Sequence, residues 1–258
     1  MALYALASAK GSPGTTVTGM ALAAVWPTDP VLADLDSSGG DLAWRCRTPD
    51  GEPIDTERGL LSLGASVRRG AHEVALEEHL QEISGGVRVL AGLRSAAQVA
   101  GLGAAWGQLP TVFKSFGDDV LADCGRVVPG SATLPLLHHA DAVLFVVRPS
   151  IEGVAHLRDR LTSLREQIDL GGVEGPPVGV AAVTSYRDTR SVPDLQQLLD
   201  SEGLQVRVLG VVADDARTAD ALRGVGYARS RRSLLIRSAA DIAGRLIDLA
   251  QSRFAPVQ

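Results

Sequence analysis

The sequence predicts an α/β fold in which a mostly parallel central sheet of about seven strands carries helices on both faces. Short apolar runs alternate with helical patterns along the chain, as crossover connections between parallel strands require. Hydrophobic residues make up 45% of the 258 residues and aromatic residues only 4%, so we expect a large aliphatic core. Residues 1–258 therefore suit a single domain.

The first half of the chain contains four of the expected strands. Each is a short apolar run bounded by turn residues, at 3–7, 31–36, 87–91 and 119–125. Helices are expected where apolar residues recur every three or four positions, at 17–26, 60–69, 74–83 and 96–109. Four glutamates in and beside the helix expected at 74–83 could suggest a cation site. Their four-residue spacing is more typical of a solvated helix face.

The second half repeats the alternation with three further strands, at 142–147, 178–183 and 206–213. Helices are expected at 148–168, 193–201 and 236–254. The last is amphipathic, and we expect it to pack on the sheet and not on a membrane. No apolar run approaches the ~18 residues of a spanning helix, and the N-terminus lacks the basic segment of a signal peptide. We therefore expect a cytoplasmic protein without stable membrane insertion.

The segment 8–16, Ser-Ala-Lys-Gly-Ser-Pro-Gly-Thr-Thr, joins the first expected strand to the first expected helix. A loop of small residues at a helix N-terminus can lay backbone N–H groups around a phosphate, with the helix dipole behind them. Lys10 stands out in this loop because Lys114 is the only other lysine of the chain. Thr16 occupies the position at which a phosphate-binding loop places the hydroxyl that binds Mg²⁺.

Carboxylates end two of the expected strands. Asp34 and Asp36 close the run at 31–36, and Asp123 closes the run at 119–125 before a Cys-Gly turn. An apolar strand that ends in aspartate is the Walker B pattern, in which the carboxylate holds Mg²⁺. The alternative is that these aspartates cap ordinary strands and turns.

Aligned on Gly14, the segment 8–16 resembles the deviant Walker A box of the ParA/MinD family, written x-K-G-G-x-G-K-[ST]-T. Four positions match that pattern: Lys10, Gly11, Gly14 and Thr16. Three positions depart from it: Ala9, Ser12 and Thr15. The change at Thr15 removes the lysine that contacts the β- and γ-phosphates, so this P-loop is degenerate.

The resemblance implies ATP and Mg²⁺ as cofactors and assigns roles to several residues. Lys10 would reach the partner's phosphates across a face-to-face homodimer, and Asp36 would place the attacking water. Thr16 and Asp123 would bind the metal. The further nucleotide contacts would come from Gly11, Ser12, Pro13, Gly14, Thr15, Thr16, Thr184 and Asp214.

Thr184 and Asp214 belong to two further parts of the resemblance, one that contacts the base and one that closes the nucleotide pocket. In the family, the strand that corresponds to 178–183 commonly ends in an asparagine that contacts the adenine edge. This chain has Thr184 and Ser185 there. Asp214 lies in a segment that resembles the family's "P-x-D" stretch closing the nucleotide pocket, although helix capping would also explain an aspartate at this position.

Two functions from different classes follow. The resemblance implies a nucleotide-dependent dimerising switch for intracellular positioning or chromosome partitioning, with slow or impaired ATP hydrolysis because of Thr15. The alternative is a scaffold with the same fold that acts through protein–protein contacts alone. The joint presence of Lys10, Thr16, Asp36 and Asp123 favours nucleotide binding, because a scaffold has no need of these four residues together.

Other ligands are less well supported by the sequence. The densest basic cluster could contact DNA, but the net charge of −5 and the lack of interleaved aromatic residues do not favour it; its members are Arg229, Arg231, Arg232 and Arg237. Cys46 and Cys124 form no spaced pair, which disfavours an iron–sulfur site like that of the related nitrogenase iron protein. His138 and His139 are adjacent on a helix and face different directions, which suits a single metal poorly.

Overall fold

The computed structural model describes residues 1–11, 13–70, 74–172, 174–222 and 232–252. Across these residues eight strands form one sheet in the order β3-β4-β2-β5-β1-β6-β7-β8. Their bounds are β1 (Leu3–Ser8), β2 (Val31–Asp34), β3 (Gln81–Glu82), β4 (Arg88–Leu90), β5 (Val120–Arg126), β6 (Ala142–Val147), β7 (Val178–Thr184) and β8 (Val206–Ala213). Neighbouring strands pair in parallel, except that β3 runs antiparallel to β4. The mostly parallel sheet predicted from the sequence is confirmed.

The central strand of this sheet is β1, the first in the chain. It pairs with β5 on one side and with β6 on the other, so that Leu3 lies opposite Val120 and Tyr4 lies opposite Ala142. All six of its residues are buried. Because β1 is covered on both faces and both edges, its residues form a continuous run of mostly apolar side chains and not an alternating pattern.

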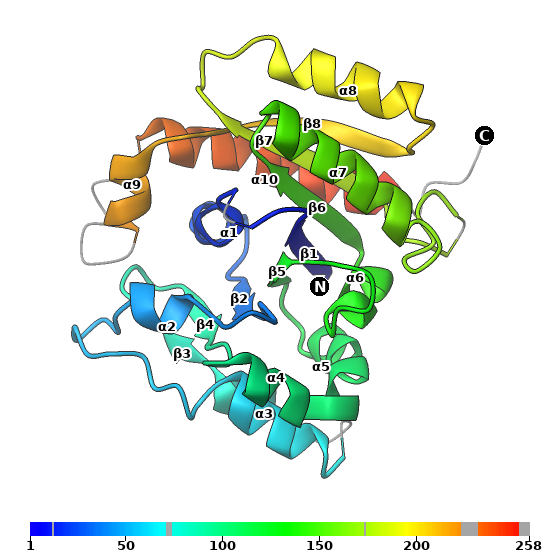
Figure 1. Cartoon of the computed structure of the whole chain (residues 1–258). Helices are drawn as coiled ribbons and strands as arrows, with labels where there is room; N and C mark the ends of the chain where they lie inside the picture. Colours follow the sequence, from blue (N-terminus) through cyan, green and yellow to red (C-terminus); the bar gives the residue numbers. More distant parts are fainter. Residues whose placement is uncertain (12, 71–73, 173, 223–231, 253–258) are drawn as a thin grey trace.

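Helices cover both faces of the sheet (Figure 1), as predicted. The helices are α1 (Thr15–Ala23), α2 (Leu42–Arg45), α3 (Leu60–Val67), α4 (Ala96–Leu102), α5 (Leu109–Ser115), α6 (Leu134–His139), α7 (Ile151–Leu164), α8 (Ser191–Ser201), α9 (Ala216–Ala221) and α10 (Leu234–Ser252). On one face, Leu3, Ala5 and Ala7 of β1 share a core with helices α3 to α8. On the other face, Tyr4 and Leu6 share a second core with α1 and α10.

The prediction of a helix at 74–83 is wrong. This segment instead forms a short 3₁₀ turn at Leu76–His79 and the edge strand β3. Leu76, Leu80 and Ile83 are all buried. Leu76 in the turn and Leu80 just before β3 pack in one core, and Ile83 just after β3 packs in the other, so their spacing does not reflect a helix. Glu77 and Glu78 lie in the turn and Glu82 lies in β3, so these three do not share the expected helix face, and Glu73 lies outside the described residues.

The helix expected at 96–109 is interrupted. It divides into α4, a 3₁₀ segment at Gly103–Gly107 and α5. Gly103 has a φ of 53°, a left-handed conformation that glycine adopts at low cost and that ends α4. Trp106 then packs into the core and donates its indole N–H to the carbonyl of Val99 at 3.1 Å.

The amphipathic pattern near the C-terminus is confirmed as α10, which packs on the sheet. Its buried side includes Ile242 and Leu246, and Ser238 donates to the carbonyl of Leu235 while accepting from the backbone N–H of Ala213. Among the described helices, none combines the length and apolarity needed to cross a bilayer.

Candidate functional site

The carboxyl ends of the parallel strands meet along one edge of the sheet, where open α/β sheets bind ligands. The loop at 9–14 follows β1, Asp36 follows β2, and Asp123 lies in the second half of β5. Thr184 ends β7, and Asp214 follows β8. The topology therefore brings every described site residue predicted from the sequence to the same edge. Ser12 lies outside the described residues.

The loop after β1 ends in a glycine with a left-handed backbone at the start of α1. Gly14 adopts a φ of 107° and precedes the first residue of α1, and its carbonyl accepts a hydrogen bond from the N–H of Thr18 at 2.8 Å. The short helix α1 thus begins directly at the loop. Thr15 is buried, and its hydroxyl has no hydrogen-bond partner among the described residues.

Asp123 is fully buried on β5 beneath this loop. Its Oδ1 accepts a hydrogen bond from the N–H of Gly125 at 3.0 Å, whereas its Oδ2 has no partner of good geometry among the described residues. Burial raises the pKa of Asp123, and the nearby hydroxyl of Thr16 opposes this shift. A buried carboxylate oxygen without a partner is unfavourable unless a ligand satisfies it, so Asp123 and Thr16 together fit a cation.

A second buried carboxylate lies beside Asp123. Asp34 pairs with Asp123 in the register of β2 and β5, and its Oδ2 accepts a hydrogen bond from the N–H of Leu42 at 2.9 Å. Burial and the neighbouring charge of Asp123 both raise the pKa of Asp34. Gly40 and Gly92 make room for this carboxylate, because a Cβ at either position would lie within 3 Å of an Asp34 side-chain atom.

Asp36 lies in the loop after β2, close to the carboxylates of Asp34 and Asp123. Its Oδ1 accepts a hydrogen bond from the N–H of Ser38 at 2.7 Å, and burial raises the pKa of this half-buried carboxyl. Its carboxylate packs on the backbone of Gly125, where a Cβ would lie 2.1 Å from Oδ2. The structure therefore brings Thr16, Asp36 and Asp123 together.

Two cavities open at this edge. One of about 210 Å³ lies between the loop after β1 and the start of α7. Lys10 lines this cavity with an exposed side chain. The pKa of Glu152 on α7 is lowered chiefly by hydrogen bonds at the start of that helix, and the charge of Lys10 adds a smaller contribution. The other cavity, of about 180 Å³, lies between the start of α1 and the start of α9. Its wall includes Gly14, Val183 and Asp214.

Thr184, predicted in place of the asparagine that contacts the base, and Asp214, predicted in the segment that closes the pocket, already have partners within the chain. The hydroxyl of Thr184 donates to Asp188 at 3.0 Å, and Thr184 lines neither cavity. Asp214 forms an ion pair with Arg148. Sequence reasoning missed Arg148, although the Arg-Pro pair directly after an apolar strand marked it as a residue at the carboxyl edge.

No three His, Cys, Asp or Glu side chains among the described residues are arranged to hold a metal ion by themselves. Cys46 and Cys124 are both buried and unbridged.

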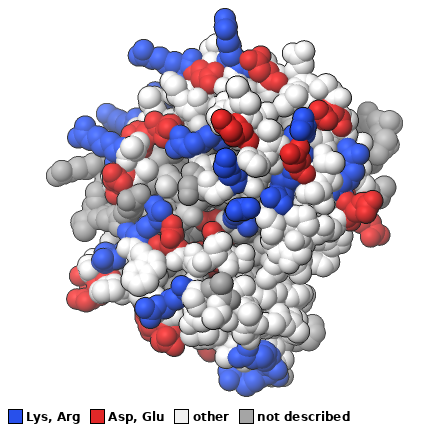
Figure 2. Space-filling view, in the orientation of Figure 1, with Lys and Arg blue, Asp and Glu red and all other residues white. Residues whose placement is uncertain are grey.

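The face shown in Figure 2 does not single out a nucleic-acid site. On the face shown in Figure 2, basic and acidic side chains are interspersed and form no continuous basic band. Of the arginines considered for DNA contact, Arg229 and Arg231 lie outside the described residues, and Arg232 is exposed.

Neither a family model nor a curated protein matches this sequence. Solved structures do match. The chain superposes on a ParA family ATPase of Chlorobium tepidum with a TM-score of 0.74 and 15% identity, covering 94% of this chain and 98% of that one. It superposes on the septum site-determining protein MinD of Pyrococcus horikoshii, solved with Mg-ADP, with a TM-score of 0.68 and 16% identity over 98% of each chain. It superposes on a plasmid partition protein of Borrelia burgdorferi, bound to AMPPNP, with a TM-score of 0.67 and 14% identity, covering 95% of this chain and 98% of that one. At these identities the likeness is one of architecture, and this chain has the α/β fold of the ParA/MinD P-loop ATPases.

Proposed function

We propose that this protein binds ATP and Mg²⁺ and acts as a nucleotide-dependent dimerising switch with weak hydrolysis. One observation carries the proposal: Thr16, Asp36 and Asp123 lie together at the carboxyl edge, beside the loop that precedes α1, and Asp123 keeps a buried oxygen without a partner among the described residues. A scaffold without a ligand would gain nothing from this arrangement, because burying the neighbouring carboxylates of Asp34 and Asp123 is costly. The ATP-binding relatives in fold support the same assignment.

Each residue has a part in the proposed chemistry. Thr16 and Asp123 would hold Mg²⁺, which neutralises charge on the phosphates when it is bound. Asp36 would orient the water that attacks the γ-phosphate, and the N–H groups at the start of α1 would bind phosphate oxygens. Lys10 is exposed at the mouth of its cavity and is free to extend towards the phosphates of a second protomer.

Thr15 explains why hydrolysis would be weak. At this position the family pattern has a lysine, whose ammonium contacts the β- and γ-phosphates. The Thr15 side chain is buried, neutral and too short for that contact. Binding would therefore depend on backbone groups, the metal and other cations of the site.

Calorimetric titration tests the proposal. We expect the wild-type protein to bind ATP and a non-hydrolysable analogue in the presence of Mg²⁺, and sedimentation to show dimers when the analogue is bound. Lys10→Ala should still bind nucleotide within a few-fold but should not dimerise, because its side chain acts on the partner's phosphates.

The other lysine supplies a matched control. The ammonium of Lys114 lies 3.1 Å from Oδ1 of Asp141. Asp141 directly precedes β6, so this ion pair lies at the amino edge of the sheet, opposite the candidate site. Lys114→Ala should dimerise like the wild type. Absence of binding heat under every condition would reject the switch and leave the scaffold as the function. Dimers that form equally with Lys10→Ala would reject the role given to Lys10.

Restoring the missing lysine is a second test. We expect Thr15→Lys to raise the affinity for ATP by roughly tenfold or more, because a charged hydrogen bond to phosphate contributes about 1.5–3 kcal/mol. Thr15→Val, which removes the hydroxyl but keeps the volume, should leave the affinity nearly unchanged. Titration of both variants with ATP and Mg²⁺ measures the difference. An affinity for Thr15→Lys at or below the wild-type value would contradict the alignment of this loop on Gly14.

A further inference from the structure

Two cations line the cavities at the carboxyl edge, and each faces an acid. Lys10 and Glu152 line the same cavity, and Arg148 forms an ion pair with Asp214. Lys10 is assigned above to the partner's nucleotide. Arg148 has no assigned role, although it is the cation of this protomer that lies between the two cavities.

The position of Arg148 is set by β6 and by the proline that follows. β6 ends at Val147, and Pro149 and Ser150 then lead into α7, with the Ser150 hydroxyl accepting from the N–H of Gly153 at 3.1 Å. Arg148 lines the cavity beside the loop after β1 and also the cavity beside α9. Among the residues that the structure describes, it is the one shared by both walls. A nucleotide with phosphates at the loop and its base towards β7 and β8 would pass Arg148.

The ion pair that holds Arg148 is exposed and can be exchanged. Its Nη1 lies 2.7 Å from Oδ2 of Asp214, and Nη2 lies 3.4 Å from Oδ1. The two side chains are 50% and 45% exposed, and exposed pairs of this kind contribute little to stability. A polyphosphate carries several charges and accepts two hydrogen bonds from one guanidinium, so it can replace a single carboxylate.

We propose that Arg148 binds the phosphates of the nucleotide in its own protomer and supplies the positive charge that Thr15 lacks. This inference rests on the proposed function, because it names a further binding residue of the same site. In the structure Asp214 competes for the guanidinium and keeps it away from the phosphates. Asp214 is itself fixed through its backbone N–H, which donates to the carbonyl of Thr184 at 2.8 Å. Asp214 thus acts against nucleotide binding and not as a contact to the base.

Variants of the two partners separate these roles. Arg148→Gln should weaken ATP binding about tenfold or more, ADP binding less, and adenosine binding not measurably, because the lost contact is to phosphate. Arg148→Lys should recover part of the ATP affinity. Asp214→Asn should bind ATP a few-fold more tightly than the wild type, since it frees the guanidinium. The double variant should match Arg148→Gln alone.

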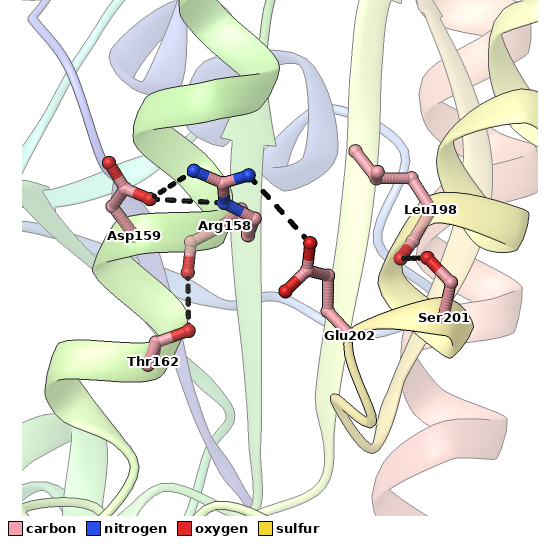
Figure 3. Close-up of polar contacts among 6 residues, drawn as sticks. All are labelled: Arg158, Asp159, Thr162, Leu198, Ser201 and Glu202. Atoms are coloured by element: carbon pink, nitrogen blue, oxygen red, sulfur yellow. Dashed lines mark hydrogen bonds and ion pairs between the residues drawn. The ribbon is translucent and has the colours of Figure 1, made fainter.

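Arg158 provides the control for removing an exposed arginine from an ion pair. Figure 3 shows its guanidinium between Asp159 on α7 and Glu202 at the end of α8. The distances are 2.9 Å from Nη2 to Asp159 Oδ1 and 3.7 Å from Nη1 to Glu202 Oε1. Arg158 lines neither of the two cavities, so Arg158→Gln should bind ATP, ADP and adenosine like the wild type.

Isothermal titration with ATP, ADP and adenosine, each at two salt concentrations, measures these effects. A smaller salt dependence of ATP binding in Arg148→Gln than in Arg158→Gln would support the phosphate contact. Equal ATP affinity in these two variants would overturn it, and so would an equal loss for adenosine and ATP. Weaker ATP binding by Asp214→Asn would also overturn it, because Asp214 would then be a ligand. If the wild type binds ATP and Arg148→Gln binds it equally, this inference falls alone; if the wild type binds no nucleotide, the proposed function falls with it.

Discussion

Alanine at position 125 is expected to displace Asp36 and to reduce the proposed ATP turnover by about 100-fold or more. The added Cβ would lie 2.1 Å from Oδ2 of Asp36, so the carboxylate must leave its place and lose the bond from the N–H of Ser38. A shift of about 1 Å in a group that positions a reactant can cost a factor of this size. Gly125 also has a φ of 59°, and we expect Gly125→Ala to lower the free energy of unfolding by about 1–3 kcal/mol.

Gly130→Ala is the matched control for this substitution. Gly130 also has a positive φ, of 79°, but no atom lies within 4 Å of the position that its Cβ would take. It therefore carries the backbone strain without the contact to Asp36. Chemical denaturation and phosphate release should be measured on both variants. Equal turnover in the two would show that Gly125 does not hold Asp36 in place.

Asp34→Asn is expected to stabilise the protein at neutral and alkaline pH. Burial and the charge of Asp123 raise the pKa of Asp34 to about 7, above the value of about 4 for an unfolded aspartate. Between these values the folded state binds more protons, so the free energy of unfolding falls as pH rises through this interval. An asparagine has no such titration, and its oxygen can still accept from the N–H of Leu42. We expect a gain of roughly 2–4 kcal/mol at pH 8 and little change near pH 4.

Urea unfolding at pH 4.5, 6 and 8 would measure this effect. The wild type should lose stability across the series, and Asp34→Asn should lose less, with the remaining slope coming from Asp123, whose pKa is also raised. Asp50→Asn, in an exposed turn, serves as the control and should follow the wild type at each pH. A difference between Asp34→Asn and the wild type that does not grow with pH would contradict the buried carboxylate pair.

The arrangement of the sheet followed from the sequence because every parallel strand is a distinct apolar run. The failures have local causes. The segment 74–83 carries helix-like spacing, but its register is fixed by pairing of Gln81 with Val89 and Glu82 with Arg88, which lie later in the chain. The break in the helix at 96–109 depends on the left-handed backbone of Gly103, which composition alone does not reveal.

For the site, the sequence predicted which residues share an edge but not which of them touch. Thr16 and Asp123 could be placed because each follows a recognisable strand. The space for Asp34 could not be foreseen, since Gly40 and Gly92 shape it from two distant segments. The pairing of Arg148 with Asp214 joins residues 66 positions apart, and no local pattern contains both of them.

The central place of β1 bears on how the protein is made. Within this chain β1 is synthesised before the strands on its two sides, which begin only at Val120 and Ala142. Its apolar residues have no edge partner until β5 has been made, and they lack the second partner until β6 has also been made. Nascent chains that pause before this point would expose an unpaired apolar segment of the kind that chaperones bind, and long-range pairing of this type also makes folding slow.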